Sequence, residues 1–219
     1  MDSELLRSIL IWGPPLILGI TLHEAAHGYV AKHFGDTTAF MLGRVTLNPI
    51  KHIDPVGTIL LPLALGFFSN WHFVFGYAKP VPVNFNNLRD PKRDMLWVAA
   101  AGPGSNIVQM LLWAVAAWLI VRFVPSPGDA TQSWVDVAAA GMRVNVVLAI
   151  LNLLPLLPLD GGRVVTSLLP NRLAYQYSRL EPYGMTLLIV LMFTGVLGKV
   201  LMPLVSVSLA LVYTMFGFQ

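Results

Sequence analysis

A His-Glu-x-x-His pattern at residues 23–27 is the part of the sequence best suited to chemistry. In a helix, His23 and His27 lie on one face, one turn apart, so both imidazoles can reach a single zinc ion. Glu24, between them, is placed to act as general base toward a zinc-activated water. The pattern falls inside an apolar stretch, where ionisable side chains are costly and usually functional. It therefore predicts a catalytic zinc site, against the alternative of two neutral histidines buried in a helix bundle.

A catalytic zinc needs a third protein ligand, and the best candidate is Asp160. It follows an apolar run that is interrupted by Pro155 and Pro158. Irregular backbone at membrane depth is tolerated only where it is buried in protein or lines a wet cavity. From these residues alone, a helix end capped by Asp160 remains an alternative. The other histidines are expected in loops or at the membrane surface and are poor ligand candidates: His33, His52 and His72.

A further polar island, Gly102-Pro103-Gly104-Ser105-Asn106, lies within another apolar run. Small residues at such spacing allow two helices to pack closely. Asn106 needs a hydrogen-bonding partner at this depth. Helix packing is the first interpretation of this island, and a role in the active site is the second.

Three motifs stand in the order typical of the site-2 protease family of intramembrane zinc metalloproteases. They are His23-Glu24-x-x-His27, Gly102-Pro103-x-x-Asn106, and Asn152-x-x-Pro155 followed by Leu159-Asp160-Gly161. The chain resembles the bacterial members of that family over about residues 15 to 165. It has neither a PDZ insertion nor a nucleotide-sensing CBS domain, so it looks like a minimal catalytic core.

The resemblance implies a zinc metalloendopeptidase with one zinc ion per chain, bound by His23, His27 and Asp160. Glu24 is the implied base. Asn152 is expected to help hold substrate or the developing oxyanion, and Asn106 is a second candidate for that role. The expected partners are a transmembrane protein substrate, membrane lipid and an accessory recognition protein, with no nucleic acid.

The composition excludes most soluble folds. Of 219 residues, 56% are hydrophobic and 11% charged, whereas soluble domains carry roughly 25% charged residues. The mean hydropathy is +0.68. There is no cysteine, which excludes disulfides and thiolate metal sites. The net charge of +3 is spread along the chain, as expected for cytoplasmic loops rather than for a nucleic-acid surface.

The apolar stretches predict an all-α polytopic membrane protein with about five transmembrane helices, or six if Val56 to Phe75 also spans. We expect three single spans at residues 8–31, 96–124 and 138–159, and a helical hairpin over 183–218. The hairpin is expected to turn around Gly195, Gly198, Lys199 and Pro203. The whole chain, residues 1–219, is predicted to form one membrane-embedded protease domain with its catalytic core at about 8–165.

The positions of the predicted zinc ligands indicate whether Val56 to Phe75 spans the membrane fully. If this segment spans fully, His27 and Asp160 lie on opposite faces of a hydrocarbon core about 30 Å thick. We therefore expect a re-entrant segment or β-hairpin near 56–82, which brings both ligands to one face. This arrangement places about ten basic residues on one side and four on the other, against about eight and six for a full span. The positive-inside rule then predicts an outside N-terminus and an active site on the cytoplasmic side of the cell membrane.

Together these features predict hydrolysis of peptide bonds within or near transmembrane segments, that is, intramembrane proteolysis. Two other classes of protein are alternatives to a protease. A transporter could use the buried His, Glu and Asp residues as an ion or proton path, but would not need a glutamate between helically paired histidines. A non-catalytic scaffold would not need all four of His23, Glu24, His27 and Asp160.

Overall fold

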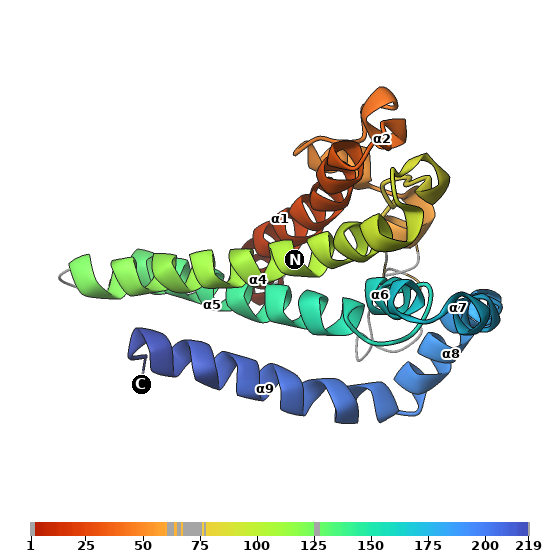
Figure 1. The fold of residues 1–219 in the computed structure, drawn as a ribbon. Helices are drawn as coiled ribbons and strands as arrows, with labels where there is room; N and C mark the ends of the chain where they lie inside the picture. Colours follow the sequence, from red (N-terminus) through yellow and green to blue (C-terminus); the bar gives the residue numbers. More distant parts are fainter. Residues whose placement is uncertain are drawn as a thin grey trace.

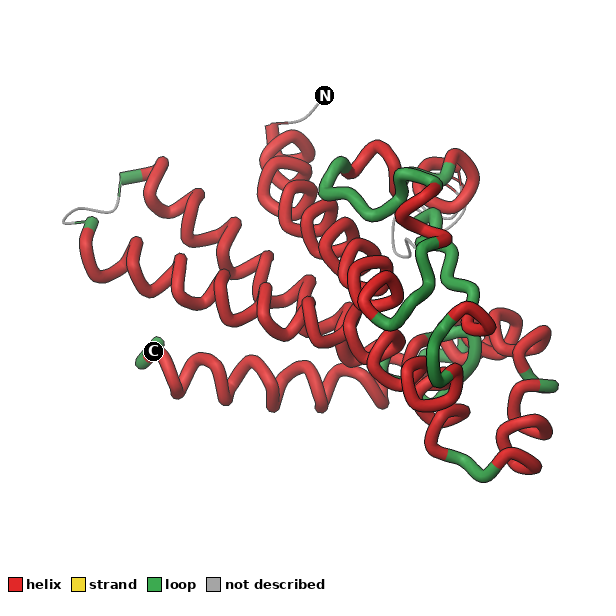
Figure 2. Tube along the Cα trace, turned by 45° about the horizontal axis from the view of Figure 1, so that its top comes forward, coloured by secondary structure: helices red, strands yellow, loops and turns green. Residues whose placement is uncertain are grey.

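A computed structural model describes residues 3–60, 64, 67, 76, 78–124 and 128–218. Every regular element in these ranges is helical, so the all-α prediction is confirmed for the described part of the chain (Figure 2). The elements are α1 (Ser3–His33), α2 (Thr38–Met41), η1 (Pro49–His52), η2 (Pro55–Leu60), η3 (Phe85–Asn87), α4 (Pro91–Phe123), α5 (Asp129–Asn152), α6 (Asp160–Leu168), α7 (Asn171–Ser178), α8 (Glu181–Phe193) and α9 (Val196–Phe216).

Four helices in the described ranges are long and apolar enough to cross a membrane. They are Leu6–His33 of α1, the whole of α4, Thr131–Asn152 of α5, and α9. Large apolar side chains such as Leu112 and Leu211 are exposed on them, as expected where a helix faces lipid. The chain is therefore a multi-pass membrane protein.

The helices α1, α4 and α5 contact one another and form the centre of the bundle. Figure 1 shows α4 and α5 running side by side, with α9 along α5. Small residues allow the close approach of α4 and α5: Ala114 and Ala138 are buried in one cluster, and a Cβ on Gly141 would lie 2.4 Å from the Trp113 ring. Close backbone approach through small residues is how membrane helices gain packing contacts.

The C-terminal stretch differs from the predicted pair of spans. The helical structure is interrupted at Gly195, where φ is +72°, between α8 and α9. However, α8 has only 13 residues and is about 20 Å long at 1.5 Å per residue. That is shorter than the hydrocarbon core of about 30 Å. The prediction of five spans is therefore not confirmed, because the described chain offers four helices of sufficient length.

The segment near 56–82 is only partly described. Its beginning, η2, is a short π-helix, and residues 78–82 have no regular secondary structure. Residues 61–63, 65, 66, 68–75 and 77 lie outside the described residues. The predicted re-entrant or β-hairpin arrangement falls largely on these residues and stays a prediction.

Asp36 fastens the loop after α1 to the segment that precedes α4. Its side chain is fully buried. It accepts hydrogen bonds from the backbone N–H and hydroxyl of Thr38, the N–H of Asn84 and the amide of Asn87. Burial alone would raise the pKa of Asp36, but these hydrogen bonds outweigh it and hold the pKa below its usual value. The carboxylate therefore fixes residues 84–87 beside the end of α1.

Candidate metal centre

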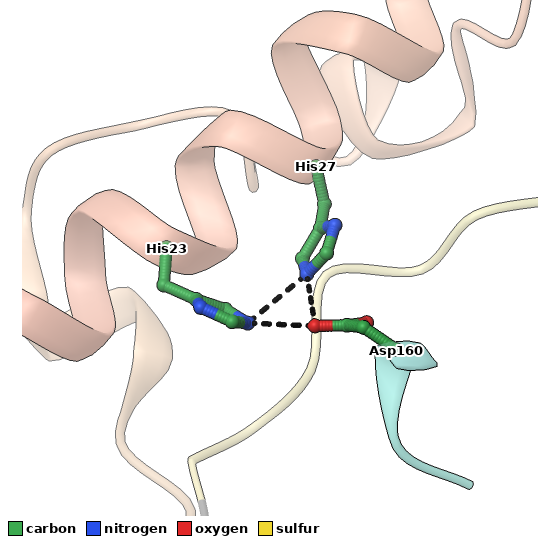
Figure 3. A group of neighbouring side chains, drawn as sticks. All are labelled: His23, His27 and Asp160. Carbon is green, nitrogen blue, oxygen red and sulfur yellow. Dashed lines mark hydrogen bonds and ion pairs between the residues drawn. The ribbon is translucent and has the colours of Figure 1, made fainter. Parts of the chain in front are cut away.

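The side chains of His23, His27 and Asp160 converge on one point (Figure 3). The two Nε2 atoms are 3.1 Å apart. They lie 3.2 and 3.3 Å from Asp160 Oδ2. Tetrahedral ligands about 2.0–2.1 Å from a zinc ion are separated by about 3.3 Å from one another. The three separations therefore match the edges of a zinc coordination tetrahedron, with one corner left for water or substrate.

The hydrogen bonds of the two imidazoles assign the Nε2 atoms as acceptors when the rings are neutral. His23 Nδ1 lies 2.6 Å from Asn106 Oδ1, and His27 Nδ1 lies 2.7 Å from the carbonyl oxygen of Val98. Each Nδ1 donates its proton to that oxygen, so in a neutral imidazole Nε2 carries the lone pair. Asp160 Oδ2 is buried, and the two imidazole Nε2 atoms at 3.2 and 3.3 Å are its polar neighbours among the described residues. With neutral imidazoles, three acceptors face one another in a buried site, an arrangement that a bound cation stabilises.

Gly102 of α4 keeps the space between these ligands open. A Cβ at this position would lie 2.4 Å from His27 Nε2 and 2.5 Å from His23 Nε2. A methyl group would thus fill the space in which an ion bound to both nitrogens must sit. The residues present fit a zinc ion in both their chemistry and the room they leave.

Asp160 reaches the histidines because it begins α6 directly after an irregular turn. A Cβ on Gly161 would lie 2.3 Å from the Leu153 carbonyl oxygen. A Cβ on Gly162 would lie 2.5 Å from the Leu157 nitrogen. Both glycines therefore let α6 start tightly against the chain that leaves α5. The side chain of Asp160 faces the histidines, and no side chain caps the first turn of α6, so the capping alternative is not what the structure shows.

Glu24 stands beside the centre and is held by an extended segment of the chain. Its Oε2 accepts a 2.7 Å hydrogen bond from the backbone N–H of Val81. Val81 lies between two prolines, which have no N–H to offer. Arg44 holds the same segment through the carbonyl oxygens of Lys79 and Pro80. The carboxylate is thus fixed through one oxygen by a segment far away in the sequence.

The two asparagines predicted to face substrate have different surroundings. Asn106 is fully buried and bonded to His23, Gly19 and Asn145. Asn152 is the last residue of α5 and is half-buried. Its side-chain NH₂ group donates a hydrogen bond to the Leu148 carbonyl oxygen one turn earlier. Asn106 therefore contacts Nδ1 of the proposed ligand His23, on the side of the ring opposite Nε2, the proposed zinc-binding atom.

The remaining histidines are not in the group. His33 is exposed at the end of α1, and His72 lies outside the described residues. His52 is 3% exposed, with Nε2 at 3.0 Å from the Thr46 carbonyl oxygen. The expectation of a solvated side chain is wrong for His52, because its ring is buried in η1, which contacts α1.

Sequence reasoning missed three contributors to the centre: the open space at Gly102, the Val81 N–H and Asn145. For Asn145 a signal existed, because an amide in the middle of an apolar span needs a reason to be there. For Gly102 the small-residue pattern indicated close packing, but not that the packing partners are the rings of His23 and His27. For Val81 no local pattern points to Glu24, since the contact joins residues 57 positions apart.

The fold and this group of side chains define a membrane-embedded protein with a His-His-Asp group whose ligand types match those of zinc hydrolases. The profile of peptidase family M50 matches residues 120–195, which include Asp160. The chain is 37% identical over 199 residues to YwhC of Bacillus subtilis, which is named as a zinc metalloprotease, covering 87% of this chain and 84% of that protein.

Two further relatives are also named as zinc metalloproteases. Rip2 of Mycolicibacterium smegmatis is 28% identical over 84% of this chain and 66% of its own length. MJ0392 of Methanocaldococcus jannaschii is 23% identical over 93% of this chain and 49% of its own length. No solved structure matches significantly. The chain belongs to peptidase family M50, and its relatives support a zinc-dependent protease activity.

Proposed function

We propose that the protein is an intramembrane zinc metalloprotease that hydrolyses peptide bonds within or near the transmembrane segments of other membrane proteins. One observation carries the proposal. Three acceptor atoms, on His23, His27 and Asp160, converge inside a bundle of membrane-spanning helices. Membership of family M50 supports hydrolysis as the reaction. A centre buried among such helices is suited to a membrane segment as substrate.

The proposed mechanism assigns each side chain a role. His23, His27 and Asp160 would hold a zinc ion, which would supply the Lewis acid that activates water and polarises the scissile carbonyl. Glu24 accepts the proton of the attacking water and delivers it to the leaving amine. Asn106 and the Val98 carbonyl orient the two imidazoles through their Nδ1–H groups. Asn152 is proposed to help hold the substrate or the developing oxyanion.

We further propose that the Val81 N–H orients the base. The hydrogen bond occupies Oε2 of Glu24, so Oε1 is the oxygen assigned to proton transfer. A base must lie within hydrogen-bond reach of the proton it removes, so fixing its carboxylate favours the reaction.

Substituting Val81→Pro tests this contact because proline removes the N–H. Residue 81 precedes Pro82 and is already confined to extended conformations, which proline tolerates. We expect kcat to fall about 10-fold, the value of one charge-assisted hydrogen bond, with zinc content unchanged. The matched control is Val81→Ala, which keeps the N–H and should retain more than half of the parent rate. Equal rates in the proline variant and the parent would show that the hydrogen bond does not assist the base.

The proposal includes an orientation and partners. The active site is assigned to the cytoplasmic side of the cell membrane and the N-terminus to the outside, on the charge distribution of the sequence. The substrate is a transmembrane protein, and an accessory protein would supply recognition.

The position of the cut tests the proposed function. The purified protein, reconstituted in lipid with a single-span substrate, should produce fragments whose masses place the cut inside or at the edge of the apolar segment. A zinc chelator should abolish cleavage, and added zinc should restore it. Cuts confined to soluble loops would contradict intramembrane proteolysis.

A further inference from the structure

We infer that Asn145 of α5 is a positioning residue for the proposed zinc ligand His23, acting through Asn106. The inference rests on the proposed zinc centre and deepens it. The hydrogen bonds of Asn145 go to Asn106 and Gly141 and not to the three proposed ligand atoms, so its effect passes through one intermediate side chain.

A continuous chain of hydrogen bonds connects α5 to the centre. Asn145 Nδ2 donates to the Gly141 carbonyl oxygen at 2.9 Å. Asn145 Oδ1 accepts from Asn106 Nδ2 at 2.9 Å. Asn106 Oδ1 in turn faces His23 Nδ1 at 2.6 Å. Both asparagines are 0% exposed, so water does not compete for any of these contacts.

Backbone carbonyls fix the direction of this chain. A carbonyl only accepts hydrogen bonds, so the NH₂ group of Asn145 must face Gly141 and its oxygen must face Asn106. The NH₂ group of Asn106 then faces this oxygen and the Gly19 carbonyl at 3.1 Å. Only the oxygen of Asn106 remains for His23. Turning either amide over would place two acceptors or two donors against each other in a buried site.

The fixed direction determines which nitrogen of His23 carries the proton. An acceptor at Nδ1 requires Nδ1–H, which leaves Nε2 unprotonated toward the ion. Outer partners of metal-bound histidines commonly set the ring orientation and tautomer in this way. The Gly141 carbonyl thus sets the tautomer of a ligand on another helix through two asparagine side chains.

Packing alone does not account for Asn145. A buried amide among apolar helices is unfavourable unless its hydrogen bonds are satisfied. Here Asn145 is satisfied by being part of the chain that ends on His23, and its Oδ1 also lies 3.3 Å from where a Cβ of Gly19 would stand. Asn145 therefore joins α5 to α4 by a hydrogen bond and lies close to Gly19 of α1.

Gln109 provides a matched control in the same region. It is 5% exposed and lies one turn after Asn106 on α4. Its NH₂ group is 3.5 Å from the Gly19 carbonyl, and its oxygen accepts no hydrogen bond from the described residues. Gln109 is thus a buried amide at similar depth that does not belong to the chain reaching His23.

The test compares zinc affinity in the detergent-purified full chain by competition with a chromophoric chelator. Asn145→Leu should weaken zinc binding about 10- to 100-fold, the usual effect of losing an outer partner of a ligand. Gln109→Leu should change it less than about threefold. Asn145→Asp should retain most of the affinity, because a protonated carboxyl can donate to Gly141 and accept from Asn106.

Two further measurements separate positioning from packing. In zinc-free protein, ¹⁵N spectra of histidine should show the Nδ1–H tautomer of His23 in the parent and a mixture in Asn145→Leu; if that variant does not fold, Asn145→Ala serves instead. In an Asn106→Asp background, either carboxylate oxygen accepts from His23, so adding Asn145→Leu should have less than threefold effect. An equal loss in both backgrounds would overturn the positioning role.

The outcomes distinguish this inference from the proposed function. A folded parent that binds no zinc would end the proposed zinc protease. A parent that binds zinc, beside an Asn145→Leu variant that binds it equally tightly with His23 in the same tautomer, would overturn the inference alone.

Discussion

Replacing Glu24 with Gln is expected to lower cleavage of a transmembrane substrate by about 10²- to 10⁴-fold, the range typical of a general base. The amide is nearly the same size as the carboxylate but cannot accept the proton of the attacking water. Glu24 is not one of the three converging ligand residues, so zinc content should remain that of the parent. Single-turnover cleavage and metal analysis of the same preparation measure both quantities.

The matched control is Glu4→Gln. Glu4 is an exposed glutamate in the first turn of the same helix, so the chemical change is identical and remote from the centre. Its cleavage rate should be within twofold of the parent rate. A Glu24→Gln variant that cleaves as fast as this control would exclude Glu24 as the base. Loss of zinc from Glu24→Gln would instead show that Glu24 belongs to the metal site.

Gly102→Ala is expected to abolish stoichiometric zinc binding. The added methyl group would lie 2.4–2.5 Å from the Nε2 atoms of both histidines, well inside van der Waals contact and in the space assigned to the ion. The backbone of α4 and the imidazoles on α1 cannot separate without losing the packing of two core helices. We expect zinc affinity to fall by more than about 100-fold, beyond the effect of losing an outer hydrogen bond.

Gly104→Ala is the control for that substitution, because it places the same methyl group on the same helix two residues later. A Cβ on Gly104 meets no atom within 4 Å. Zinc affinity and cleavage should therefore match the parent. Stoichiometric, tight zinc in Gly102→Ala would contradict the position assigned to the ion. Loss of zinc in both variants would point to a general effect on α4 rather than to the occupied space.

The proposed ligands could be named from the sequence because their relation is largely local. A spacing of four residues already puts two imidazoles on one face of a helix. Asp160 was harder, since its partners lie more than 130 residues away, yet the prolines and glycines around it indicated an irregular turn at membrane depth. In the structure all three residues meet at the start of α6, where Gly161 and Gly162 allow the helix to pack tightly against the preceding chain.

Contacts between distant segments could not be predicted in the same way. The bond from Val81 to Glu24 and the chain from Asn145 to His23 depend on how three helices and a loop pack, and no periodic pattern encodes them. The five-span prediction had a related weakness. The sequence predicts a turn around Gly195, Gly198, Lys199 and Pro203, and the structure confirms the break at Gly195, whereas the other three residues lie inside α9. Hydropathy does not show that this break leaves helices of 13 and 21 residues.

The most direct test of the central claim is the zinc content of the folded, purified parent. The convergence of His23, His27 and Asp160 on one point predicts close to one zinc per chain, retained through purification and released by a strong chelator. A folded parent with no bound zinc, which gains none when zinc is added, would contradict the metalloprotease and favour an ion or proton path through the same residues.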